Sequence, residues 1–141
     1  MKKLLFVLLL SLASALPSPA AEKPEVAKIR AYYNDLLKRI KDQSLYQRDL
    51  ILTYEVIPGI GAPSSRVRIC YDMVEKGEGV LDIAIVRIEN YYQHAGNALF
   101  EECVFDARGD LVFYFVRRGQ GDIMNPGGIE WASDERYYYE S

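Results

Sequence analysis

The sequence has few of the side chains on which metal and nucleophilic sites depend. Its 141 residues include one histidine and two cysteines, too few to complete a four-ligand zinc site or a disulfide-rich miniprotein. Basic residues are not in excess either, because 17 Lys and Arg stand against 20 Asp and Glu. Nucleic-acid-binding domains normally carry a basic surplus on one face. We therefore expect no metal ion, no other cofactor and no nucleic-acid partner.

Long hydrophobic runs are lacking except at the N-terminus. A basic start, residues 1–3, precedes the apolar run 4–12 and then small residues around Ala15 and Ala20. This order is typical of a secretory signal peptide, and the run is shorter than the roughly 20 residues that span a bilayer. We predict a signal peptide at 1–20, cleaved after Ala20 or else after Ala15. The protein would then be an exported bacterial protein, periplasmic or extracellular, with no membrane span in the mature chain.

Residues 21–141 are predicted to form a single α+β domain. Half of all residues are apolar and the net charge is only −3, which excludes a disordered chain. From Pro24 onwards apolar side chains recur with the helical period over about 18 residues. The residues that carry this period are Val26, Ile29, Tyr33, Leu36, Leu37 and Ile40. Such a helix is marginal alone, so its apolar side must pack against something else.

After Ser44 the apolar period changes from helical to two, which indicates β-strands. The expected strands are 46–56, 66–74, 80–92, 99–106, 111–118 and 135–139. Residues 46–56 alternate as a strand with one buried face does, and the slipped alternation near Val86 predicts a bulge or strong bend. The tightest turn signal is 106–110, with Gly109 in the left-handed position. Together these features predict one N-terminal amphipathic helix packed on a bent antiparallel meander of about five to six strands.

A helix laid across such a sheet resembles, in general shape only, the cystatin-like and nuclear-transport-factor-like folds. The chain lacks the inhibitory Gln-x-Val-x-Gly stretch of the cystatins, and it lacks a convergent polar set for a pocket. The resemblance therefore implies an architecture and no activity, because one fold can serve many functions.

No residue is assigned a catalytic role. His94, the one histidine, falls in the expected turn 93–97, and no nucleophile with a recognisable motif accompanies it. Glu101 and Glu102 are adjacent on a strand, so their carboxylates should point to opposite faces and cannot act on one bond. The sequence thus favours a protein without enzymatic activity.

The two cysteines, Cys70 and Cys103, could form a disulfide in an oxidising compartment. Against this, one strand is expected between them, which separates their backbones by about two strand spacings of ~4.8 Å. A disulfide needs Cα atoms within roughly 7 Å. Both a disulfide and two free thiols remain open at this stage.

Tyrosine is the one surplus, with eleven residues, several of them doubled or tripled in sequence. Neighbours on a strand face opposite ways, so some rings should lie on the sheet face away from the helix. The residues expected to form this aromatic surface are Tyr114, Tyr138, Phe100, Val112 and Val116. An exposed surface of this kind suits contact with a partner. A sheet curled tightly around its helix would instead leave little of this aromatic surface uncovered.

Three functional hypotheses follow. The leading one is an exported, non-catalytic protein that binds a protein, a peptide or an envelope polymer through the aromatic sheet face. A second is a small ligand-binding or hydrolytic domain whose cavity, between helix and sheet, is lined by Tyr33, Tyr71 and Phe113. A third is a structural homodimer in which two open sheet faces pack together.

Overall fold

The computed structural model describes residues 23–59, 61–121 and 128–140, and within them it confirms the α+β class. One helix is followed by six antiparallel strands. The helix is α1 (Pro24–Lys41), and the strands are β1 (Tyr46–Thr53), β2 (Ser64–Glu75), β3 (Leu81–His94), β4 (Asn97–Phe105), β5 (Leu111–Gly121) and β6 (Ile129–Tyr138). The predicted signal peptide and its cleavage site lie outside the described residues.

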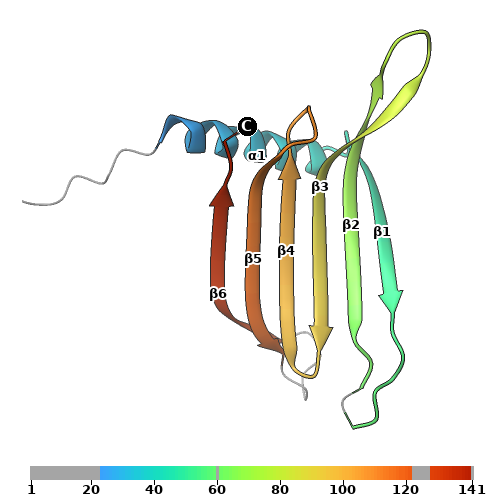
Figure 1. Ribbon diagram of the computed structural model, residues 1–141, viewed down its shortest axis with the longest axis vertical. Helices are drawn as coiled ribbons and strands as arrows, with labels where there is room; N and C mark the ends of the chain where they lie inside the picture. The colour runs from blue at the N-terminus through green and yellow to red at the C-terminus, as the bar shows by residue number, and fades with distance from the viewer. Residues whose placement is uncertain (1–22, 60, 122–127, 141) are drawn as a thin grey trace, which may run out of the picture.

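Helix α1 begins and ends where its sequence predicts. Pro24 occupies the first turn, where a missing N–H costs nothing, and basic residues in the last turn complement the negative helix end. Figure 1 shows α1 crossing behind the sheet at one end of the strands, so that it covers only part of one face. Leu36, 1 % exposed, is its most deeply buried side chain.

The six strands form one sheet in which spatial order follows chain order, β1 to β6 (Figure 1). The predicted irregularity at Val86 is confirmed, because Cys70 pairs with Arg87 and Tyr71 with Ile85, which leaves Val86 as an extra residue. A second bulge was not expected. Val104 pairs with Phe113 and Phe105 with Leu111, so Val112 is extra on β5. Each bulge shifts the side-chain alternation along its strand.

The core lies between α1 and the sheet. Its members are Leu36, Leu45, Cys70, Val86, Val104, Val112 and Phe113, with Ile29, Tyr32, Tyr33, Ile40, Phe115 and Tyr138 packed against them. We call the sheet side that carries Cys70, Val104 and Phe113 the helix-side face, and the other the open face.

One expectation about burial is wrong. Residues 46–56 alternate like a strand with a buried side, but β1 ends at Thr53 and all eight of its residues are exposed. The physical reason is its position. β1 is an edge strand that pairs only with β2, and no described element covers either of its faces.

Candidate functional site

The five residues expected to form one aromatic surface are divided between the two faces of the sheet. Tyr138 pairs with Phe113, and Phe100 pairs with Arg117, which places both on the helix-side face. Val112 belongs to the core because the β5 bulge turns it there. Only Tyr114 and Val116 lie on the open face, and Val116 is buried among its neighbours.

The part of the open face around Tyr114 is polar and internally hydrogen-bonded. The Tyr114 hydroxyl donates to Glu101 at 2.7 Å, the Asn90 amide donates to the other Glu101 oxygen at 3.1 Å, and Ser65 donates to Asn90 at 3.0 Å. Burial and the hydrogen bond to Glu101 raise the pKa of Tyr114 to about 12. Since these polar groups satisfy one another, this area offers little to an apolar partner.

The other side of the open face, over β1, β2 and β3, carries an exposed apolar surface that the sequence analysis missed. We call it the apolar stripe, and its members are the exposed Tyr46, Leu50, Leu52, Met73, Ile83 and Ile85 together with the half-buried Tyr71. The strand register pairs Tyr46 with Tyr71 and Met73 with Ile83, so the side chains share one face. The rings of Tyr46 and Tyr71 stack with centroids 5.4 Å apart. Leu50 is 50 % exposed and Ile83 is 57 % exposed.

A groove of about 410 Å³ extends the apolar stripe towards the β2–β3 hairpin. Figure 1 shows this hairpin projecting beyond the end of the sheet. The groove lies between this hairpin and the β4–β5 turn. Ile83 and Ile85 contribute to it together with Phe105. An ion pair between Lys76 and Asp82, 2.5 Å apart, lies at its margin.

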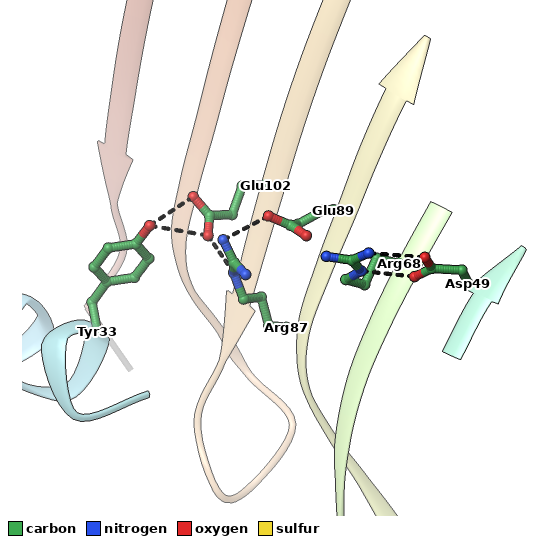
Figure 2. Close-up of polar contacts among 6 residues, drawn as sticks. All are labelled: Tyr33, Asp49, Arg68, Arg87, Glu89 and Glu102. Carbon is green, nitrogen blue, oxygen red and sulfur yellow. Dashed lines mark hydrogen bonds and ion pairs between the residues drawn. The ribbon is translucent and has the colours of Figure 1, made fainter. Parts of the chain in front are cut away.

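On the helix-side face, a cluster of charged groups is buried between the middle of α1 and the sheet. Figure 2 shows Tyr33, Glu102, Arg87 and Glu89 pointing toward one another from α1, β4 and β3. The Tyr33 hydroxyl lies 3.1 and 3.0 Å from the two Glu102 oxygens. Arg87 bonds Glu102 through Nε and Glu89 through Nη2, the latter at 2.8 Å. The side chain of Glu102 is only 3 % exposed.

The electrostatics of this cluster favour a fixed, fully paired arrangement. Burial and the Glu102 charge raise the pKa of Tyr33 to about 12. Desolvation of Arg87 would lower its pKa, but the charges of Glu102 and Glu89 outweigh it and the pKa is raised. Tyrosine and arginine therefore keep their protons at neutral pH, and the cluster orients α1 on the sheet.

Sequence reasoning placed Glu102 correctly on the face opposite Glu101 but missed its burial. The available signal was its position between Phe100 and Val104, whose side chains share the Glu102 side of the strand. Farther along the same face, Arg68 and Asp49 form a bidentate pair at 2.7 and 2.8 Å (Figure 2).

A cavity of about 280 Å³ lies between α1 and the strands β5 and β6. Its lining residues are Ile29, Arg30, Tyr33, Phe113, Arg136 and Tyr138. Two of the three residues expected for a helix–sheet cavity, Tyr33 and Phe113, line it. The third, Tyr71, lies on the open face in the stack with Tyr46.

Both cysteines are free thiols. Cys70 on β2 faces the helix and is fully buried, whereas Cys103 pairs with Tyr114 on the open face. Strand β3 lies between their strands. Burial raises the pKa of both thiols, which is the opposite of what an activated nucleophile requires.

Within residues 23–59, 61–121 and 128–140, no group of three or more His, Cys, Asp and Glu side chains is placed to hold a metal ion. No helix in the same ranges is both long and apolar enough to cross a membrane. Comparison with protein-family models, with curated proteins and with solved structures finds no match.

Proposed function

We propose that the protein is an exported, non-catalytic binding protein that receives an extended polypeptide segment on the apolar stripe and the adjoining β1 edge. The observation that carries this proposal is the distribution of exposed apolar side chains. Among the described residues, sixteen large hydrophobics are exposed, and six of them share the open face of β1, β2 and β3 in the apolar stripe. Soluble monomers rarely leave such residues gathered in one area without a binding role.

A polypeptide is favoured because β1 offers backbone as well as side chains. As an edge strand paired only with β2, it presents unpaired N–H and C=O groups that a further strand can use. Natural edges are often blocked by charged side chains or Pro. Strand β1 contains no Lys or Pro, and of its two charged residues, Arg48 and Asp49, Asp49 is paired with Arg68. Leu50 and Leu52 project from one side of this edge, which would select alternate apolar residues in the partner.

Export is supported by the sequence of residues 1–20 alone. Expression of the full chain in a bacterium, followed by mass spectrometry of the exported product, tests it. We expect a mature N-terminus at residue 21, or at residue 16 for the alternative cleavage. Retention of the intact chain in the cytoplasm would contradict the proposal.

The general shape is a further part of the proposal. A long N-terminal helix lying across antiparallel strands supports the likeness to cystatin-like and nuclear-transport-factor-like shapes. This likeness concerns architecture and adds no activity.

Selection from a random peptide-display library tests the binding role. We expect the wild-type chain to enrich peptides with alternating apolar residues, and Leu50→Glu to abolish the enrichment because a buried unpaired carboxylate opposes docking. Tyr137→Ser, on the same face but outside the stripe, is the matched control and should bind like the wild type.

Two results would overturn the binding role. One is a selection in which Leu50→Glu enriches the same peptides as the wild type. The other is a stable dimer in sedimentation equilibrium that Leu50→Glu converts to monomer. In that case the stripe joins two copies of the chain, as the homodimer hypothesis holds.

A further inference from the structure

The cavity between α1 and the strands β5 and β6 lies away from the apolar stripe and has an aromatic wall. The rings of Tyr33 and Phe113 have centroids 5.2 Å apart, and those of Phe113 and Tyr138 are 5.3 Å apart. Both pairs are tilted, with interplanar angles of 54° and 48°. Rings tilted in this way present faces and edges on which a further ring can pack edge-to-face or offset.

Each of the three rings is held by contacts of its own, so the cavity is preformed. The Tyr33 hydroxyl donates to Glu102 at 3.0 Å, and Phe113 is 6 % exposed and lies between the other two rings. The ring and the hydroxyl of Tyr138 both contact Arg30 of α1. Closing the cavity would therefore break contacts on α1, β4, β5 and β6. Pockets that bind small molecules are usually preformed in this way.

The cavity is larger than a packing defect. Its volume of about 280 Å³ equals roughly nine waters at ~30 Å³ of liquid volume each, whereas packed protein interiors leave few voids larger than one water. An ordered water needs about two to four polar partners, and the ring carbons and the Ile29 side chain of the wall offer none. An apolar molecule therefore fits the interior better than water does.

The charged residues of the lining favour a neutral ligand. Arg136 is ion-paired with Asp134 at 3.7 Å, and its guanidinium carbon lies 5.1 Å from the ring centre of Phe115. Among the described residues that line the cavity none is acidic, and the two guanidinium groups of Arg30 and Arg136 disfavour a cation. Any ion also loses hydration when it enters an apolar space. A neutral molecule avoids both costs.

We propose that this cavity binds a small neutral aromatic molecule of one or two fused rings. The ligand ring packs among Tyr33, Phe113 and Tyr138, and ring packing supplies the affinity without an ion pair. The volume is too small for a lipid or a nucleotide. Such a ring can belong to a free small molecule or to a tryptophan side chain of a polypeptide, because both present the same neutral ring.

Titration of the ¹⁵N-labelled protein with indole up to about 10 mM, followed by NMR, tests the site. A ligand of about nine heavy atoms reaches a Kd on the order of 1 mM at ordinary ligand efficiency. We expect saturable shifts at residues of α1, β5 and β6. Phenol should bind at least threefold tighter than cyclohexanol, because the saturated ring loses the ring–ring contacts. Tryptamine should bind at least tenfold more weakly than indole, because it brings a cation beside two guanidinium groups.

Two variants of α1 form a matched pair. Ile29→Trp places a ring of the protein's own in the cavity and should weaken indole binding at least tenfold. Leu37→Trp adds the same ring to α1 at a position that is 38 % exposed and outside the lining, and it should leave indole binding unchanged. Leu50→Glu in the apolar stripe should also leave it unchanged, so this site and the stripe are tested separately.

The ligand comparisons use the wild-type chain, so they decide the matter even if a variant fails to fold. Absence of saturable shifts, equal affinity of phenol and cyclohexanol, or tryptamine binding as tight as that of indole would overturn the proposal. Full indole binding by a folded Ile29→Trp chain would do so as well. A parallel titration with N-acetyltryptophanamide distinguishes the sources. Tighter binding of this amide assigns the ring to a polypeptide, and tighter binding of indole assigns it to a free molecule.

Discussion

At the scale of single residues, the most constrained group is the buried carboxylate of Glu102. It is the shared partner of a tyrosine from the helix and an arginine from the neighbouring strand. A buried charge network adds little stability relative to an apolar core, but losing one member leaves another charge without compensation. The intact cluster therefore adds little to the free energy of unfolding, but replacing one of its members should destabilise the fold strongly.

We expect Glu102→Gln to lower the free energy of unfolding by about 3 kcal/mol. This value is at the lower end of the cost measured when one partner of a buried ion pair is removed. Glu101→Gln, one residue away on the open face, should cost about 1 kcal/mol. Urea denaturation monitored by circular dichroism measures both. Equal losses for the two variants would contradict the burial of Glu102.

The pH dependence of two tyrosines is a second prediction at this scale. The pKa values of Tyr33 and Tyr114 are each raised to about 12, against an ordinary value near 10. A phenol with a raised folded-state pKa stabilises the fold fully below about pH 10, and this contribution is lost as the pH rises towards about 12.

An ultraviolet titration of the folded protein should therefore show a late phase near pH 12. We expect Tyr33→Phe and Tyr114→Phe each to remove part of that phase. A late phase unchanged in both variants would show that other residues produce it.

At the scale of elements, the stability of α1 depends on the sheet against which it packs. Its sequence defines its ends, but a helix of 18 residues is marginal without packing. Adjacent residues show the two environments, because Leu36 is 1 % exposed and Leu37 is 38 % exposed.

Leu36→Ala should destabilise the protein by about 2–5 kcal/mol, the usual cost of a cavity in a core. Leu37→Ala makes the same chemical change at the next position and should cost less than about 1 kcal/mol. Thermal unfolding of the two variants compares them directly. Similar melting temperatures would mean that the helix is not docked by the side containing Leu36.

At the scale of the whole molecule, apolar residues lie in two different environments. Those under α1 are buried in the core, whereas those of the apolar stripe are largely exposed. Val104 has no exposed surface and Ile85 is 40 % exposed, although both lie on strands of the same sheet.

We expect the double variant Leu50→Ser and Ile85→Ser to change the free energy of unfolding by no more than about 1 kcal/mol, since surface substitutions usually cost within 0.5 kcal/mol each. Val104→Ala alone should cost about 2 kcal/mol or more, because it opens a cavity. Chemical denaturation measures these values. A large loss from the double variant would assign the stripe to the core and remove the basis for binding.

Local patterns account for the elements that the sequence predicted well. The helical period from Pro24 and the turn at Gly109, where φ is +86°, depend on neighbours within a few residues. The bulge at Val86 was also visible, because it breaks an alternation within one strand. The bulge at Val112 was not, since residues 111–116 are apolar on both sides and conceal any slip.

The sequence by itself determined the helix, the strands β1 to β5 to within a few residues, and the opposite orientation of Glu101 and Glu102, because periodicity and turn chemistry act over short distances. It placed the last strand at 135–139, whereas β6 is Ile129–Tyr138. Only the tertiary structure decided which apolar faces are covered. That outcome depends on where α1 crosses the sheet and on how each bulge shifts the register. For this reason the exposed apolar surface lies on the strands β1, β2 and β3, and not around Tyr138 and Phe100 as the sequence predicted.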